Sequence, residues 1–256
     1  MPTDERPPPT GRVRGWNPDV GPRLDSAIDQ LRTSELTVAG RLPWSSNLTF
    51  LVTLENDGPE PLNAVYKPAR GEQSLWDFPG GLYRREVAAF ALSEGLGWGL
   101  VPPTVERDDG PFGPGSLQLF VEADYEQHYF TLFDGGGHDA ALRTTCAFDV
   151  VANNADRKSG HVLLGPDRRL WAIDHGLCFH HQPKLRTVIW DFADEPVPGN
   201  LLDDLDGLAS SLPDELGRVL TALEREALVA RIRHVVDSGV FPGPIGDRPP
   251  YPWPLV

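Results

Sequence analysis

The stretch FDVVANNADRKSGHVLLGPDRRLWAIDHG, residues 148–176, is the part of this 256-residue sequence that most restricts the choice of fold. A polar loop, residues 153–161, interrupts apolar sequence after a helix-like run, and two short apolar segments follow, joined by GPDRR. A hairpin there would bring the carboxylates of Asp156 and Asp174 together. Such a pair suits phosphoryl transfer, in which one aspartate orients or deprotonates a hydroxyl and the other holds Mg²⁺ on a nucleotide.

Upstream of this stretch the sequence predicts mainly strands. Alternating or β-branched runs bounded by turn residues indicate strands, and an Ala-, Glu- and Leu-rich run that ends at glycine indicates a helix. These patterns predict a helix over 24–33, strands over 35–42, 46–55 and 63–69, a helix over 82–97 and a strand over 115–121.

Downstream the predicted elements are mostly helical. They are a helix over 138–154, short strands over 161–164 and 170–174, and helices over 201–209 and 214–237. Strands followed by helices are typical of an α+β fold, here with an antiparallel β-rich N-lobe and a mostly helical C-lobe. We expect an extended or disordered proline-rich arm over 1–22, the N-lobe over 23–121 and the C-lobe over 122–256. Ligands favour the cleft between two such lobes.

The composition excludes some partners. Lys and Arg total 23 against 37 Asp and Glu, and the net charge of −14 opposes binding to nucleic acid. No apolar run reaches the roughly 18 residues that span a bilayer, and no secretory signal or polybasic segment is present, so we expect a cytoplasmic protein without stable membrane association. Lysine is rare, which makes each one worth inspecting: Lys67, Lys158 and Lys184.

The two candidate aspartates lie in motifs that resemble a known family. Residues 154–157, Asn-Ala-Asp-Arg, with a polar residue at 161, and then 173–176, Ile-Asp-His-Gly, resemble the catalytic pair of phosphoinositide 3-/4-kinase-like atypical kinases. The resemblance implies a two-lobed protein-kinase-like fold. It also implies that Asp156 and Asn154 are catalytic and that Asp174 is the principal metal ligand. His161 lies where the family usually has a metal-binding Asn.

The same resemblance implies a nucleotide site in the N-lobe. A strand lysine, Lys67, would hold the ATP phosphates, and a helix glutamate, Glu86, would fix its ammonium group. No Gly-rich phosphate loop is present, and a serine-containing loop is the candidate replacement. The candidate residues are Ser45, Ser46 and Asn47 at the phosphates and Val121 and Glu122 at the adenine.

These features predict an ATP-dependent kinase that uses Mg²⁺ or Mn²⁺ and phosphorylates a hydroxyl of an unidentified protein or small soluble molecule. A pseudokinase-like nucleotide-binding module is an alternative, motivated by His161 and the missing glycine loop. A metal-dependent hydrolase is another, built on the cluster of His161, His175, Cys178, His180 and His181. Ordinary structural roles also stay open: Lys67 as a strand end, Glu86 as a surface charge, and both aspartates as turn residues.

Overall fold

The computed structural model describes residues 15–19, 21, 23–43, 47–55, 61–244 and 250–255. It divides into a first unit, Met1–Val87 with Pro102–Ala123, and a second unit, Ala88–Val101 with Asp124–Val256. The N-lobe predicted over 23–121 contains residues 88–101, which here group with the second unit. Helix α2, Leu82–Gly95, therefore contributes residues to both units.

The first unit is built on a five-stranded antiparallel sheet with the strand order β1-β2-β3-β5-β4. Its strands are β1 (Leu36–Arg41), β2 (Phe50–Leu54), β3 (Leu62–Pro68), β4 (Thr104–Arg107) and β5 (Gly115–Leu119). Sequence patterns did not predict β4. It is only four residues long and follows two prolines, and its pairing with β5 comes from tertiary contact rather than from a local signal.

Helix α1 (Leu24–Thr33) is fixed to the sheet of the first unit. Its apolar stripe buries Ala27 and Leu31. The guanidinium of Arg107, on β4, donates to the carbonyls of Leu31 at 2.8 Å and Ser34 at 3.1 Å. A cation at carbonyls left unpaired by the end of a helix is favourable, so Arg107 joins α1 to β4.

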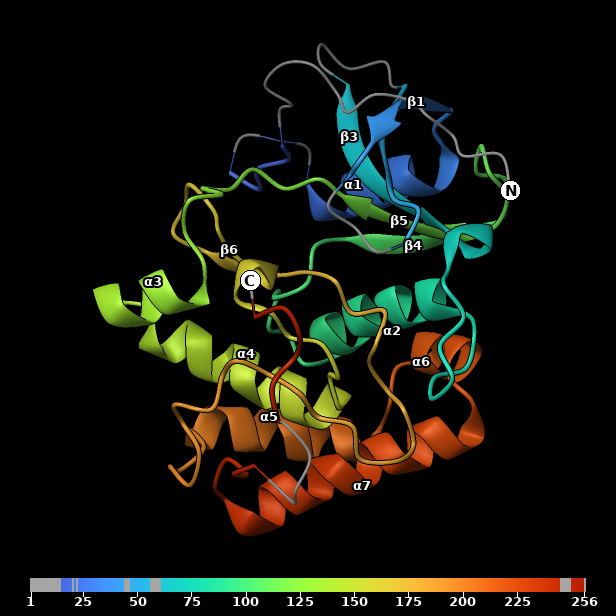
Figure 1. Cartoon of the computed structure of the whole chain (residues 1–256). Coiled ribbons are helices and arrows are strands. Elements are labelled where there is room, and N and C mark those ends of the chain that lie inside the picture. Colours follow the sequence, from blue (N-terminus) through green and yellow to red (C-terminus); the bar gives the residue numbers. More distant parts are fainter. Residues whose placement is uncertain are drawn as a thin grey trace. The chain divides into compact units, whose positions relative to one another are not determined.

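The second unit is mostly helical, with one short hairpin. Its elements are α3 (Tyr129–Gly135), α4 (Asp139–Ala152), β6 (Val162–Leu164), β7 (Leu170–Ala172), α5 (Gly199–Ser210), α6 (Asp214–Val219) and α7 (Ala222–Ser238). Two single 3₁₀ turns, Ala69–Gly71 in the first unit and Ser159–His161 in the second, complete the assignment. Helix α4 packs on α3 and α7, and α5 packs on α7 (Figure 1). A continuous apolar core forms among these helices.

The predicted single helix over 214–237 is two helices. Between them Thr221 begins α7 with a capping box: its hydroxyl accepts from the N–H of Glu224, and the Glu224 carboxylate accepts from the N–H of Thr221. This reciprocal pairing satisfies two N–H groups that lack helical partners and sets the start of a new helix.

Replacing Thr221 with Ala should lower the free energy of unfolding by about 1 kcal/mol, because the N–H of Glu224 loses its acceptor. Urea denaturation monitored by circular dichroism measures the change. Thr221→Ser keeps the hydroxyl and should stay close to wild type. Equal losses in the two variants would mean that the cap does not contribute.

No helix in the described ranges is both long and apolar enough to cross a membrane.

Candidate functional site

In the first unit, Lys67 and Glu86 form an ion pair between β3 and α2. Along β3, Ala64, Tyr66 and Pro68 are buried, and the alternation turns Lys67 to the other face, where its side chain is 22% exposed. The side chain of Glu86 is only 3% exposed. A buried carboxylate requires a cation, so the pair holds the ammonium of Lys67 in place while one side of it still meets solvent.

The predicted phosphate loop is described only in part. Ser45 and Ser46 lie outside the described residues. The side-chain oxygen of Asn47 accepts from the backbone N–H of Gln73 at 2.9 Å. In this structure the Asn47 amide therefore links two segments of the first unit, and its role toward phosphate stays a prediction.

The predicted adenine residues follow β5 and pair with a segment from near the start of the chain. Val121 is buried and forms a parallel bridge with Trp16. The backbone N–H of Trp16 donates to the carbonyl of Phe120 at 2.6 Å, and that of Glu122 donates to the carbonyl of Trp16 at 2.9 Å. Trp16 is 5% exposed, so this part of the expected proline-rich arm packs against the segment that follows β5. No sequence pattern predicted that contact.

In the second unit, the loop that carries Asp156 begins where α4 ends. Asn153 ends the helix in the left-handed conformation, with φ 54°. Its amide nitrogen donates to the carbonyls of His180 and Gln182, and its amide oxygen accepts from the N–H of Lys184. One asparagine thus ends the helix and ties the loop to residues 180–184, and asparagine suits this place because it tolerates left-handed backbone.

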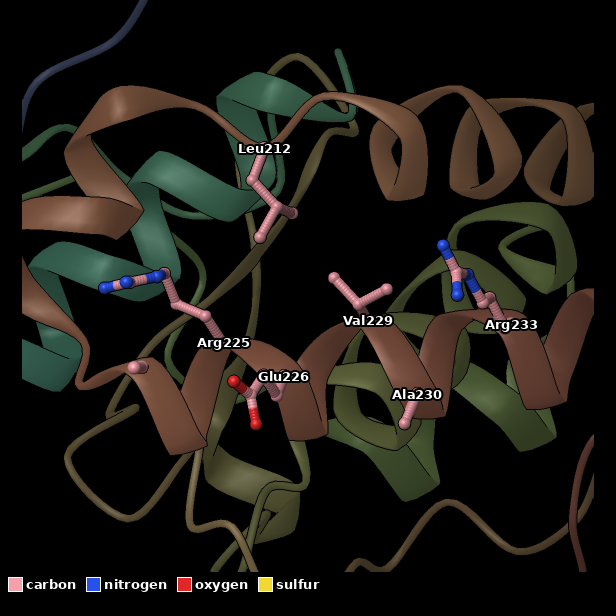
Figure 2. A pocket seen from close by; sticks show the side chains of 7 residues that line it. Leu212, Arg225, Glu226, Val229, Ala230 and Arg233 are labelled. Carbon is pink, nitrogen blue, oxygen red and sulfur yellow. The ribbon is translucent and has the colours of Figure 1, made fainter.

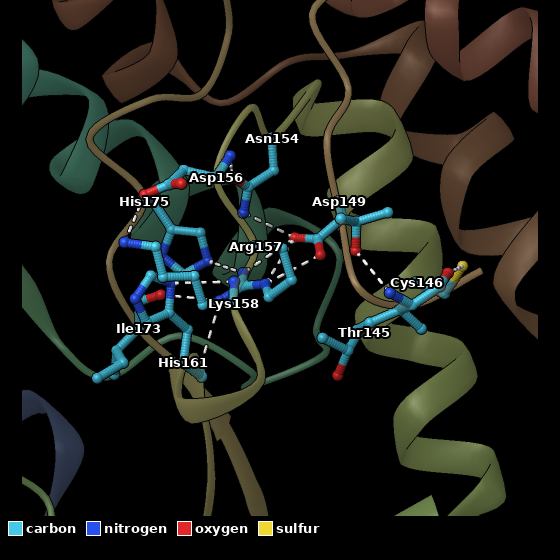
Figure 3. A network of polar contacts seen from close by, with 12 residues as sticks. Thr145, Cys146, Asp149, Asn154, Asp156, Arg157, Lys158, His161, Ile173 and His175 are labelled. Carbon is cyan, nitrogen blue, oxygen red and sulfur yellow. Dashed lines mark hydrogen bonds and ion pairs between the residues drawn. The ribbon is translucent and has the colours of Figure 1, made fainter. Parts of the chain in front are cut away.

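Arg157 joins the two segments that carry the candidate aspartates (Figure 3). Its fully buried guanidinium is paired with the buried carboxylate of Asp149 on α4 at 2.9 Å. The same guanidinium donates to the carbonyl of Ile173 at 2.8 Å and contacts Nε2 of His175 at 2.7 Å. Because arginine only donates, Nε2 of His175 is an acceptor. The loop at 156 and the end of β7 at 174 are therefore fixed to a common buried ion pair.

Asn154, predicted to be catalytic, is fully buried. Its amide nitrogen donates to Asp149 at 3.0 Å, and its amide oxygen accepts from the N–H of Asp156 at 3.0 Å. In this geometry the side chain shapes the loop that presents Asp156 and does not itself face solvent.

The Asp156 carboxylate is accessible and has an altered proton affinity. Its side chain is 27% exposed and lies 3.4 Å from the ammonium of Lys158. Burial raises the pKa of Asp156 to about 6; Lys158 and Arg186 oppose the rise, and Asp174 adds to it. A carboxylate that titrates near neutral pH can act as a general base. Lys158 was not assigned a role from the sequence, although the rarity of lysine was a usable signal.

Asp174 follows β7 in a left-handed conformation, with φ 61°. Its carboxylate is 47% exposed and lies 3.5 Å from Nε2 of His161. The backbone N–H of Lys158 donates to Nδ1 of His161 at 3.4 Å, which places the proton of a neutral ring on Nε2, toward Asp174. In that tautomer Nε2 carries a proton, which His161 would have to release before that nitrogen could bind a metal ion.

These residues fit a divalent ion that arrives with a nucleotide. Mg²⁺ is usually held by one or two carboxylates together with substrate phosphates and water, and Asp174 offers a carboxylate that is 47% exposed. In the described part of the chain, no group of three or more His, Cys, Asp or Glu side chains is arranged to hold a metal ion.

The histidines of the metal-dependent hydrolase hypothesis take part in separate contacts. Nε2 of His175 is engaged by Arg157, and Nδ1 of His180 accepts from the N–H of Gln182 at 3.0 Å. His181 stacks on His180, and Cys178 is buried. The histidines that cluster in the sequence do not converge on one point, because the backbone turns them into different hydrogen bonds.

Two surface pockets of the second unit lie away from these residues. One, of about 380 Å³, is lined by residues of α7 and by Leu212 (Figure 2). Arg225 in its wall already donates to the carbonyls of Gly217 and Leu220. Another lies beside Trp98 and Arg169. Neither pocket is lined by a predicted site residue.

Comparisons with known proteins found one sequence relative and several similar structures. Protein Rv2133c of Mycobacterium tuberculosis is 40% identical to this chain in an alignment that covers 88% of this chain and 93% of that protein. No family model matches the sequence. The structure of hydra Fam20 with sugar matches 89% of this chain and 91% of that chain, with 18% identity and a TM-score of 0.56. The Helicobacter pylori proinflammatory kinase CtkA matches 82% of this chain and 94% of that chain, with 10% identity and a TM-score of 0.48.

The predicted fold class is confirmed: the fold is α+β and protein-kinase-like, with an antiparallel β-rich part and a mostly helical part. Membership of the phosphoinositide 3-/4-kinase-like family stays a prediction.

Proposed function

The chain belongs to the same family as Protein Rv2133c of Mycobacterium tuberculosis and has a protein-kinase-like fold, and on this basis we propose that it is an ATP-dependent phosphotransferase. The acceptor is a hydroxyl group of a protein or a small molecule. The γ-phosphoryl group moves to that hydroxyl, and ADP leaves.

The observation that carries the proposal is the ion pair between Lys67 and Glu86. The two residues lie 19 positions apart, on a strand and a helix, and the carboxylate is almost completely buried. An ordinary surface ion pair is exposed on both sides and contributes little to stability. The burial of Glu86 distinguishes this pair from such surface pairs. A lysine held at a fixed place with one open side is suited to the phosphates of a nucleotide.

The second unit supplies the groups for the transfer itself. Asp156 accepts the proton of the attacking hydroxyl as the new bond to the γ-phosphorus forms and the bond to the β,γ-bridging oxygen breaks. Lys158, 3.4 Å from Asp156, places positive charge where negative charge builds up on the transferred group. A bound Mg²⁺ or Mn²⁺ would be held by Asp174 and would neutralise nucleotide charge.

The proposal requires that Lys67 and Asp174 act on the same triphosphate. Within the second unit, Arg157 fixes the segments that carry Asp156 and Asp174 to one buried ion pair, so that these two carboxylates keep a constant separation. Fixed positions of this kind are the main source of rate enhancement in phosphoryl transfer.

A nucleotide-binding module without turnover is the second candidate. The observation that favours it is the position of His161, whose Nε2 lies 3.5 Å from Asp174 at the place where the resembled family has an Asn that binds metal. Such a module would bind ATP and release it unchanged. A cytoplasmic location stays a prediction for either candidate.

The test is incubation of the purified protein with labelled ATP and Mg²⁺ or Mn²⁺, with label followed into the protein and into candidate hydroxyl acceptors. Lys67→Met should lower transfer by about 10²-fold or more, because a fixed cation at the transferring group is lost. Glu86→Gln should also lower transfer, since it frees the ammonium of Lys67. Nucleotide binding without any transfer would favour the module.

Glu94→Gln is the matched control for Glu86→Gln. Glu94 is on the same helix but exposed, so that the same chemical change there should leave transfer at the wild-type rate. If Lys67→Met transferred the phosphoryl group at the wild-type rate, Lys67 would have no part in the mechanism. The proposal would then lose its main support.

A further inference from the structure

Trp16 forms an isolated parallel β-bridge with Val121. Two backbone hydrogen bonds on either side of Val121 hold it: the carbonyl of Phe120 accepts from the N–H of Trp16, and the N–H of Glu122 donates to the carbonyl of Trp16. The side chain of Asn17 adds a contact, its amide donating to the carboxylate of Glu122 at 3.4 Å. All of these residues belong to the first unit.

The approach of the two backbones is very close. A Cβ added to Gly15 would lie 2.2 Å from the nitrogen of Glu122 and 2.3 Å from the carbonyl carbon of Val121, so that only glycine fits there. The N–H of Gly21 donates to the carbonyl of Asn17 at 2.7 Å, and a Cβ on Gly21 would meet the indole of Trp16 at 2.8 Å. The hydrogen bond between Asn17 and Gly21 thus closes a turn that packs against the indole of Trp16.

The carbonyl of Phe120 and the N–H of Glu122 are also the groups that a purine base would use. One edge of adenine offers a donor, the 6-amino group, beside an acceptor, the ring nitrogen N1. A strand edge with one carbonyl and one N–H on the same side, around one intervening residue, complements that edge. In this structure the backbone N–H of Trp16 already donates to the carbonyl of Phe120, and the backbone carbonyl of Trp16 already accepts from the N–H of Glu122.

We infer that residues 15–17 compete with the nucleotide base for the backbone groups of Phe120 and Glu122. ATP can form hydrogen bonds with these groups only when residues 15–17 have moved away from them. The inference rests on the proposed function, and it assigns a regulatory contact to a segment that sequence patterns identified only as an arm. Because binding is possible only in the open state, the apparent affinity for ATP is reduced by the fraction of molecules that are open.

The close approach of Gly15 offers a way to open the contact. Gly15→Ala forces the segment away from Glu122, because the clash is with backbone that cannot rotate aside. Gly80→Ala is the matched control: it makes the same change in a loop of the same unit, where the added carbon meets nothing within 4 Å. Binding of ATP with Mg²⁺ is measured by calorimetry for wild type and both variants.

We expect Gly15→Ala to bind ATP more tightly, by about tenfold if the closed state of the wild type holds about nine molecules in ten, and Gly80→Ala to bind as wild type does. Hydrogen exchange at residues 15–19 of the wild type should become faster when ATP is added. Trp16→Ala serves as a second opening variant, and thermal melting establishes that each variant is folded.

Equal or weaker binding by folded Gly15→Ala and Trp16→Ala, or no change in exchange at residues 15–19, would overturn the inference and leave the proposed function intact. Failure of the proposed function has a different pattern. In that case wild type and all variants bind no ATP, or bind it without any transfer.

Discussion

Asp156→Asn should lower the rate of phosphoryl transfer by about 10²–10⁴-fold, because the variant cannot accept the proton of the attacking hydroxyl. Asparagine has nearly the size of aspartate, so the loop built around Arg157 should keep its shape and ATP should bind with nearly unchanged affinity. Transfer is measured at saturating ATP, and binding is measured separately. Transfer at the wild-type rate would remove Asp156 from the mechanism.

The pH dependence gives a second measurement on the same residue. Burial raises the pKa of Asp156 to about 6, so the carboxyl is protonated and inactive below that pH and is ionised above it. The wild-type rate should therefore rise with pH through about 6 and then level off. The residual rate of Asp156→Asn should not show this step, and a step that survives in the variant would belong to another group.

Asp203→Asn is the control for the Asp156 variant. Asp203 is exposed on α5, and the same change of carboxylate to amide there should leave both the rate and its pH profile unchanged. A loss at Asp203 of the size expected at Asp156 would indicate a general effect of lower negative charge.

Asp149→Ala is expected to be the most destabilising of these changes. It leaves the guanidinium of Arg157 buried without its carboxylate, and breaking a buried pair from one side costs about 3–5 kcal/mol. The amide of Asn154 also loses its acceptor. The free energy of unfolding from urea or guanidinium denaturation measures the loss.

Asp139→Ala is the matched control on the same helix. Asp139 also pairs with an arginine, Arg143, but its side chain is 65% exposed, so its loss should cost about 1 kcal/mol or less. Similar losses at the two positions would show that burial of the Asp149 pair does not matter, and that Arg157 does not hold the loop through this contact.

Much of the fold was predictable because its signals are local. Helix α1 has the predicted bounds, since its apolar positions recur at helical spacing, and α2, α4 and the hairpin of β6 and β7 lie where the sequence patterns placed them. The break between α6 and α7 also has a local signal, Thr221 with Glu224 three residues later, which the longer run of helix-forming residues concealed.

The candidate site was predicted only as a set of residue types. The sequence motifs selected Lys67, Glu86, Asp156 and Asp174 as candidates, but which of their neighbours face solvent depends on packing. Asn154 has the same polar character as a catalytic residue, yet it is fully buried and its amide bonds to Asp149 and to the N–H of Asp156. Lys158 has no motif of its own and gains interest only because it lies 3.4 Å from Asp156.

The sequence by itself determined the order and type of most elements, the sign of the net charge and the aspartates worth testing, because periodicity, turn chemistry and composition act over a few residues. Tertiary structure alone decided that Trp16 pairs with Val121, that β4 joins β5, and that His161 lies beside Asp174 while His175 contacts Arg157. Each of these depends on which backbone groups from distant parts of the chain meet, and on the requirement that buried polar groups find partners.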